Sequence, residues 1–175
     1  EEYVKFKDND IPLDQLINKY SWYYLNTYVT NIVDGKLFIV DGQQRLTTIT
    51  LMLIKLMHLS RVYKSNLEDW IKTKITGHSG FKKEFWLSHE VHKNALQSLF
   101  DGKDLDKINT DAGITSVNMV KNYSVIGKWL DKEIKTKSKY EAFVFYFLNR
   151  LVLINLNVEQ TEVPMVFEVI NDRGV

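Results

Sequence analysis

The feature that most constrains this chain is a junction near residue 41, where a short apolar run meets a long helical pattern. The run Leu-Phe-Ile-Val over residues 37–40 is β-prone and follows Asp34-Gly35, a dipeptide typical of tight turns. Apolar residues then recur at helical spacing, with more apolar residues on a second face. We therefore expect a hairpin whose second strand ends at Asp41, followed by a central helix over about residues 43–59 that is buried on most sides.

Downstream of this helix the sequence is helical and charged up to about residue 150, where the apolar spacing changes. Ser88 and Ser116 stand where N-caps are expected, because a hydroxyl there can accept a hydrogen bond from an unpaired backbone N–H. Alternating apolar residues over 151–158 predict a strand, and Pro164 predicts the start of a last helix over 165–170. The helices expected in between cover residues 67–75, 88–100, 116–134 and 140–150.

This order of elements predicts an α+β fold in which two strand–helix units bracket a helical block. Residues 1–62 and 151–175 are expected to form the core, with a small mixed sheet that pairs the first and last thirds of the chain. Residues 63–150 are expected to form a mainly α-helical insertion, or helical subdomain.

Charge and cysteine content limit the classes of function. The 175 residues carry 23 Lys plus Arg against 22 Asp plus Glu, so contact with DNA, RNA or an anionic membrane would need a local basic patch. The absence of cysteine excludes disulfides and cysteine-based zinc sites. The longest strongly apolar stretch without a charge, residues 46–54, is too short to cross a bilayer, and the first residues do not form a signal peptide. We expect a cytoplasmic fragment of a larger protein with no membrane contact.

The most informative segment is Val-Asp-Gly-Gln-Gln-Arg-Leu-Thr-Thr over residues 40–48. Spacing alone favours a structural interpretation, in which Asp41 as N-cap and Gln44 three residues later make a capping box. Arg45 does not fit this interpretation, because a cation in the first turn of a helix opposes the macrodipole by about 0.3–1 kcal/mol. A bound anion would reverse that sign. We therefore favour a binding site at this turn.

An anion site here would give each residue a definable task. Backbone N–H groups at the helix start can bind a phosphate, Gly42 permits close approach, and Arg45 can make paired charge-assisted hydrogen bonds. Asp41 would hold Mg²⁺, and Gln43 or Gln44 could orient a water or a sugar hydroxyl. Neither the P-loop pattern nor G-x-G-x-x-G occurs in the chain, so a nucleotide site would be of a different kind.

The same segment, followed by an aliphatic helix, resembles a signature of the GmrSD-type restriction endonuclease N-terminal domain family. The run Phe-Glu-Val-Ile-Asn-Asp-Arg-Gly over residues 167–174 resembles the second signature of that family, a Phe-Glu helix that ends in Asn-x-Arg-Gly. The two motifs stand in the right order with a helical insertion between them. The likeness covers most of the chain.

The resemblance implies a ParB/sulfiredoxin-like core that binds nucleoside phosphates at a strand–turn–helix junction. It implies an NTP-binding and NTP-hydrolysing domain, dependent on Mg²⁺, in a DNA-restriction protein of phage defence. The expected catalytic residues are Asp41, Gln43, Gln44 and Arg45, with Asp41 as the metal ligand. The expected nucleotide-binding residues are Gly42, Arg45, Thr47, Asn171 and Arg173. DNA would be bound through the full-length protein, which would add a C-terminal nuclease or effector domain.

Weaker signals have ordinary explanations that we prefer. Aromatic residues near the first strand are expected in the core, although one ring could stack on a base; they are Trp22, Tyr23, Tyr24, Tyr28 and Phe38. The lysines between residues 128 and 139 are expected on a solvated helix end, with Asp131–Lys135 and Glu133–Lys137 as i,i+4 pairs, rather than in a nucleic-acid patch.

Two further alternatives stay open at this point. Asn171 and Gly174 would also suit an ordinary helix C-cap, with Arg173 at the negative pole of the helix. The alternative to an NTPase is a non-catalytic DNA- or protein-binding module on the same fold, in which the anion site reads a backbone phosphate or stays empty.

Overall fold

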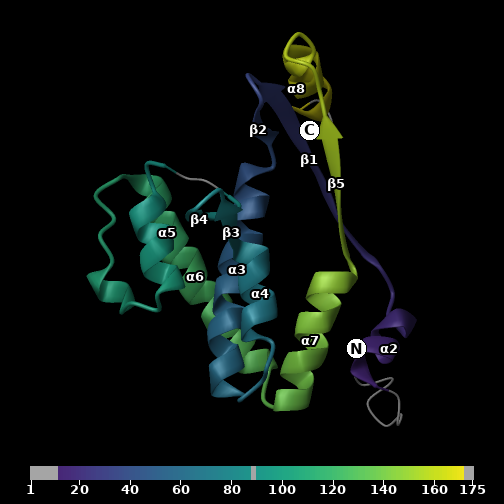
Figure 1. The fold of residues 1–175 in the computed structure, drawn as a ribbon, viewed down its shortest axis with the longest axis vertical. Coiled ribbons are helices and arrows are strands. Elements are labelled where there is room, and N and C mark those ends of the chain that lie inside the picture. Colours follow the sequence, from purple (N-terminus) through teal and green to yellow (C-terminus); the bar gives the residue numbers. More distant parts are fainter. Residues whose placement is uncertain (1–11, 88–89, 172–175) are drawn as a thin grey trace.

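The computed structural model describes residues 12–87 and 90–171, which form a three-stranded sheet and an α-helical body (Figure 1). In chain order the elements are α2 (Leu13–Leu16), the 3-10 helix η1 (Ile17–Lys19), β1 (Tyr23–Val33), β2 (Lys36–Asp41), α3 (Gln43–Val62), α4 (Glu68–Ile75), β3 (Thr76–Ser79), β4 (Lys82–Phe85), α5 (Lys93–Phe100), η2 (Leu105–Lys107), α6 (Ile114–Glu133), α7 (Lys137–Asn149), β5 (Leu151–Asn157) and α8 (Val163–Asn171). The predicted α+β fold with a small mixed sheet and a mainly helical insertion is confirmed.

The sheet has β1 in the middle, antiparallel to β2 and parallel to β5. Asp34 and Gly35 connect β1 to β2 with φ angles of 50° and 73°, the positive values that the tightest hairpin turns require. Along β5, Leu151 lies opposite Tyr23 and Asn157 lies opposite Thr30. The predicted hairpin and the predicted pairing of the first and last thirds of the chain are both confirmed.

Buried polar side chains of β1 form hydrogen bonds with β5 and the residue that follows it. Thr30 is fully buried, and its hydroxyl donates to Asn155 Oδ1 at 2.9 Å. Asn31, also buried, donates through Nδ2 to the Val158 carbonyl oxygen at 2.9 Å. Each bond stabilises the fold by about 1 kcal/mol, and leaving either buried group unpaired costs more.

Helix α3 is the centre of the hydrophobic core. Leu51, Ile54 and Leu56 have no exposed surface and pack in one cluster with apolar residues of α4, α5, α6 and α7. The predicted central helix is therefore confirmed, with its end at Val62 instead of about residue 59. In Figure 1 α3 runs through the helical body, while the sheet projects beyond the end at which α3 begins.

The predicted insertion contains a hairpin that the sequence analysis missed. Strands β3 and β4 pair from Thr76–Phe85 to Ser79–Lys82. Residue 77 must be a glycine in this arrangement, because a Cβ atom there would clash with the ring of Trp86 at 2.0 Å. The indole Nε1 of Trp86 donates to the Thr73 carbonyl oxygen at 2.9 Å and holds the ring against the preceding helix.

One predicted N-cap is wrong and one falls outside the described residues. Helix α6 begins at Ile114 after Gly113, so Ser116 lies inside its first turn, where it is buried and shares a 2.9 Å hydrogen bond with Nδ1 of His92. Ser88 is outside the described residues; α5 begins at Lys93 with His92 as its N-cap residue.

The predicted lysine pairs are wrong because the helix ends within them. Helix α6 stops at Glu133 and α7 starts at Lys137, so these two residues do not share a helix. Lys135 Nζ donates to the backbone carbonyl of Asp131, and Lys137 lies 3.8 Å from Glu141.

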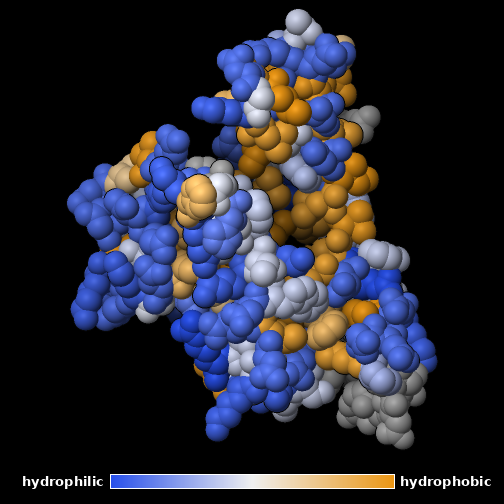
Figure 2. Space-filling model, in the orientation of Figure 1, coloured by the Kyte–Doolittle hydropathy of each residue, from blue (hydrophilic) through white to orange (hydrophobic). Residues whose placement is uncertain are grey.

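The prediction that the aromatic residues near β1 lie in the core is also wrong for most of them. Trp22, Tyr23, Tyr24 and Phe38 are 64%, 55%, 56% and 51% exposed, and Tyr28 is half-buried. In Figure 2 apolar surface extends over the sheet and into the hollow between it and the helical body. Among residues 12–87 and 90–171, no helix is long and apolar enough to span a membrane.

Candidate functional site

Gly42 makes the turn between β2 and α3. Its φ of 88° lies in the left-handed region, and a Cβ atom there would lie 2.7 Å from Cβ of Tyr28. Only glycine meets both conditions without strain. Gly42 is also the N-cap residue and, having no side chain, offers α3 no capping hydrogen bond. The capping box between Asp41 and Gln44 is therefore not formed, and the N-cap residue provides no side-chain acceptor for the first-turn amides.

Arg45 lies in the first turn of α3 and is half-buried. Its Nη1 donates to the backbone carbonyl of Thr27 on β1, so the side chain folds back across the end of the helix towards the sheet. A guanidinium has five N–H donors, and this bond uses one of them. No described residue accepts from the others, which remain for a second acceptor in the hollow that Arg45 lines.

Asp41, the last residue of β2, supplies the negative charge of the site. It is half-buried, and its carboxylate has neither a hydrogen bond nor an ion pair with any residue that the structure describes. A carboxylate at this depth without a protein partner is suited to a metal ion or to water.

The two glutamines differ in how their amides are used. Gln43 Nε2 donates to the Ile39 carbonyl oxygen at 2.8 Å, which ties the helix start to β2. The side-chain amide of Gln44 is exposed and makes no hydrogen bond within the described part of the chain. The Thr47 hydroxyl donates to the Gln43 carbonyl oxygen at 2.7 Å, as threonines on helices commonly do.

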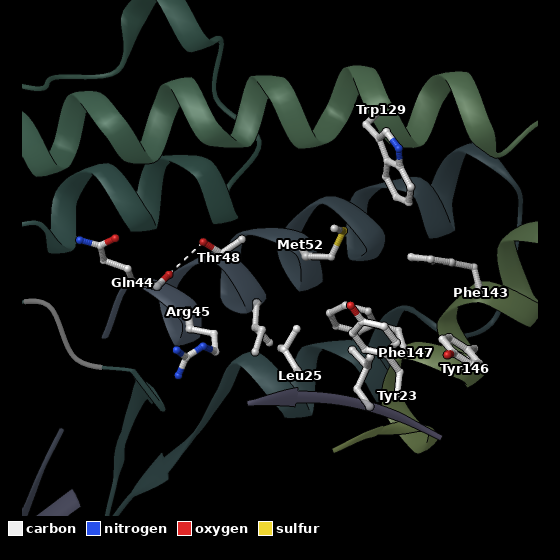
Figure 3. A pocket seen from close by; sticks show the side chains of 12 residues that line it. Tyr23, Leu25, Gln44, Arg45, Thr48, Met52, Trp129, Phe143, Tyr146 and Phe147 are labelled. Atoms are coloured by element: carbon white, nitrogen blue, oxygen red, sulfur yellow. Dashed lines mark hydrogen bonds between the residues drawn. The ribbon is translucent and has the colours of Figure 1, made fainter. Parts of the chain in front are cut away.

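Two hollows meet at this turn. A polar hollow of about 450 Å³ is lined by residues 40–45 and includes Asp41, Gly42 and Arg45. An apolar groove of about 800 Å³, here called the aromatic groove, adjoins it, and Gln44 and Arg45 line both. Figure 3 shows Gln44 and Arg45 at one end of this groove and aromatic rings at the other.

The aromatic groove separates the sheet from the helical body. Its lining comes from five elements and consists of Tyr23, Leu25, Gln44, Arg45, Thr48, Ile49, Met52, Trp129, Phe143, Tyr146, Phe147 and Leu151. Apart from Tyr23, Gln44 and Arg45, the sequence analysis singled out none of these for binding. No local signal could have found the others, because β1, α3, α6, α7 and β5 come together only in the fold.

A third hollow, of about 330 Å³, lies on the α6 side of α3 and is lined mainly by amides and hydroxyls. Gln43, Gln44, Thr47 and Thr48 face Thr115, Asn118 and Asn122 across it. It has no charged residue in its lining.

The structure thus brings together the predicted residues from 41 to 47 at one helix start. Asn171 is the last residue of α8, and Arg173 lies outside the described residues. Their part in the pocket stays a prediction. Within residues 12–87 and 90–171 there is no cluster of three or more His, Asp or Glu side chains that could hold a metal ion.

Fold and site define an α+β domain whose candidate site is a strand–glycine–helix turn beside an apolar groove. Residues 7–175 match the family model described as GmrSD restriction endonuclease, N-terminal domain, and the chain therefore belongs to that family. The family is one of restriction endonucleases, which act on DNA in phage defence. Comparisons with curated proteins and with solved structures gave no match, so the ParB/sulfiredoxin-like character of the core stays a prediction.

Proposed function

We propose that this domain binds and hydrolyses a nucleoside triphosphate, with the phosphates held at the turn from Asp41 to Arg45. One observation carries the proposal. A half-buried guanidinium, a helix start whose N-cap residue is a glycine, and a carboxylate without a partner among the described residues all line one polar hollow. Family membership in a restriction system and the resemblance of this segment to the family signature support the same assignment.

The electrostatics of the turn favour an anion. The start of α3 carries about half a positive charge from the helix macrodipole, and Arg45 adds a full charge within the same turn. These two charges repel each other without an anion and both attract a phosphate. The left-handed Gly42 lets phosphate oxygens approach the backbone amides closely.

Asp41 fits the role of the Mg²⁺ ligand. Mg²⁺ is commonly bound by one or two carboxylates together with substrate phosphates, so a three-residue metal cluster is not required. When bound, Mg²⁺ would neutralise charge on the phosphates. The half-buried carboxylate of Asp41 lines the hollow and has no partner among the described residues.

For hydrolysis a water must be held near the terminal phosphate, and Gln44 is the better placed of the two glutamines. Its amide is unbonded within the described residues, whereas the Gln43 amide is held by Ile39. Attack of the water on the terminal phosphorus breaks the bond to the bridging oxygen and releases phosphate and a nucleoside diphosphate.

Calorimetric titration with NTP and Mg²⁺ tests the binding step. Arg45→Ala should weaken binding by about 1.5–3 kcal/mol, roughly ten- to a hundredfold, the usual contribution of a hydrogen bond to a charged group. Arg61→Ala is the matched control, because it removes the same charge from the far end of α3, where Arg61 pairs with Glu68. Equal affinity of the Arg45 variant and the parent would remove Arg45 from the site.

Phosphate release tests the chemical step separately. Gln44→Leu should lower kcat on the order of a hundredfold with little change in KM, since it removes the group that positions water. Gln97→Leu on α5, whose amide bonds Asp101, is the control. An unchanged kcat for Gln44→Leu would assign the water to another residue.

One observation favours the alternative, a non-catalytic DNA- or protein-binding module. The bond from Arg45 to the Thr27 carbonyl joins α3 to β1, and by itself this is a structural role for the guanidinium. Measuring phosphate release with and without DNA, and DNA binding against salt, separates the two functions. Tight, salt-dependent DNA binding without turnover would establish the alternative.

A further inference from the structure

The aromatic groove is larger than the polar hollow at the turn, and the phosphate site leaves it unused. Its volume of about 800 Å³ is within the range of small-molecule pockets, and its lining is predominantly apolar. Gln44 and Arg45, at one end of the groove, also line the polar hollow. A ligand with a charged end and an apolar aromatic end would therefore occupy both hollows together.

The apolar end of the groove presents aromatic faces to such a ligand. Trp129, Phe143 and Phe147 form a row with successive ring centroids 6.0 Å apart. Tyr23 lies across the groove on β1 and is 55% exposed, and Trp129 is 47% exposed. Rings this exposed beside a hollow have faces available for stacking, and Figure 3 shows them projecting into the same space as Met52.

The chemistry of this lining selects the occupant. A purely aliphatic ligand would gain nothing from the polar end, and a free phosphate would gain nothing from the rings. A nucleobase stacks on aromatic side chains through its π-face, and it carries donors and acceptors at its edge. Among described residues that line the groove, Gln44 offers an unbonded amide at the boundary between the two hollows.

We propose that the aromatic groove is the base-binding part of the nucleotide site, with Tyr23 and Trp129 stacking on the base and Arg45 at the junction with the phosphates. This inference rests on the proposed function, since it places the remainder of the same ligand. It makes the sheet and the helical body two walls of one site, so that a bound nucleotide contacts both.

The experiment compares two kinds of probe, inorganic tripolyphosphate and the four common NTPs, all with Mg²⁺, by calorimetry on the full protein. Tripolyphosphate carries the charge without the base. The parent should bind the preferred NTP at least tenfold more tightly than tripolyphosphate. Tyr23→Leu and Trp129→Leu should each weaken NTP binding several-fold to tenfold and leave tripolyphosphate binding unchanged.

Tyr24→Leu is the matched control for Tyr23→Leu. Tyr24 is the next residue on β1, is 56% exposed, and does not line the groove, since neighbouring side chains in a strand point to opposite faces. It should leave both affinities at the parent values. The thermal midpoint of each variant, measured without ligand, checks that the loss of affinity is not a loss of fold.

The outcomes separate this inference from the proposed function. If Arg45→Ala weakens binding of both probes while the two groove variants leave NTP binding unchanged, the phosphate site stands and the base-binding groove is overturned. If the parent binds neither probe, the proposed function itself fails, and this inference fails with it. Equal losses in Tyr23→Leu and Tyr24→Leu would also overturn it, because the effect would then not belong to the groove.

Discussion

The helical body and the three-stranded sheet bury their apolar residues to very different extents. In the body, Leu56, Ile71 and Leu130 have no exposed surface, whereas Ile32 and Leu37 on the sheet are 56% and 60% exposed. Burial of apolar area is the main source of folding free energy, so the body supplies most of the stability. The sheet keeps apolar surface exposed, and exposed apolar surface beside a hollow is typical of binding sites.

The largest expected effect comes from a matched pair of leucines, one in each region. Leu56→Ala in the core of the body should lower the free energy of unfolding by about 2–5 kcal/mol, because it leaves a cavity. Leu156→Ala on β5, where the leucine is 42% exposed, should cost about 1 kcal/mol. Urea unfolding measures both. Equal losses would contradict the division of stability between body and sheet.

A pair of glycines tests the junction between the two regions. Gly42→Ala should cost about 2–4 kcal/mol, because it adds a left-handed alanine and also a clash with Tyr28. Gly35→Ala, at a φ of 73° but with nothing within 4 Å, should cost about 1 kcal/mol from the backbone alone. Thermal unfolding of the two variants gives the difference. A Gly42 variant no less stable than the Gly35 variant would show that the turn accommodates a Cβ atom at residue 42 with little strain.

Loss of the hydrogen bond between Thr30 and Asn155 in the sheet should have a smaller effect on stability. Thr30→Val removes the hydroxyl that donates to Asn155 and should cost about 1 kcal/mol. Thr73→Val is the control, because this threonine is exposed and its hydroxyl donates to the Trp70 carbonyl of its own helix. Hydrogen exchange of the β5 amides is the sharper measurement, and faster exchange in the Thr30 variant alone is the expected result.

The smallest effect concerns the pH dependence of the body. Burial lowers the pKa of His58 below its ordinary value of 6.5, and the nearby charges of Arg61 and Lys55 lower it further. The hydrogen bond to the Phe100 carbonyl partly opposes this shift. In the neutral form Nε2 donates to that carbonyl at 2.9 Å, and Nδ1 accepts from the Tyr123 hydroxyl at 2.8 Å. Because the folded state binds the proton less readily than the unfolded state, stability should fall as the pH drops below 6.5.

His58→Gln should flatten this part of the pH profile of unfolding. His78→Gln, at an exposed histidine on β3, controls for loss of an imidazole elsewhere in the body. A profile that keeps its slope in the His58 variant would assign the acid sensitivity to other groups.

The sequence predicted those features of the fold that local rules determine, and it missed those that depend on contacts between elements. The hairpin at Asp34-Gly35 and the helix after Gly42 follow from local backbone and spacing rules, and both were predicted. The position of Ser116 was not, because α6 begins earlier, at Ile114, and the Ser116 hydroxyl is bound by His92 at the N-cap of α5. Strand spacing likewise could not show that Tyr23 stays exposed, since exposure depends on whether a helix covers that face.

In the candidate site, residues that are contiguous in the sequence could be predicted, and residues that come from separate elements could not. The turn from Asp41 to Arg45 is one continuous segment, so its chemistry was visible in the sequence. The aromatic groove takes Met52, Trp129 and Phe147 from three helices, and none of them stands in a motif. The sequence did not show which of Gln43 and Gln44 has a free amide, and the bond from Gln43 to Ile39 separates them.

The most direct test of the central claim is the amide NMR spectrum of the protein during titration with NTP and Mg²⁺. If phosphates bind at the start of α3, the backbone amides of Gln43, Gln44 and Arg45 should show the largest shifts, because they would gain charged acceptors. The Arg45→Ala variant should lose those shifts at the same ligand concentration. Saturable shifts confined to other elements, with these three amides unmoved, would contradict the account.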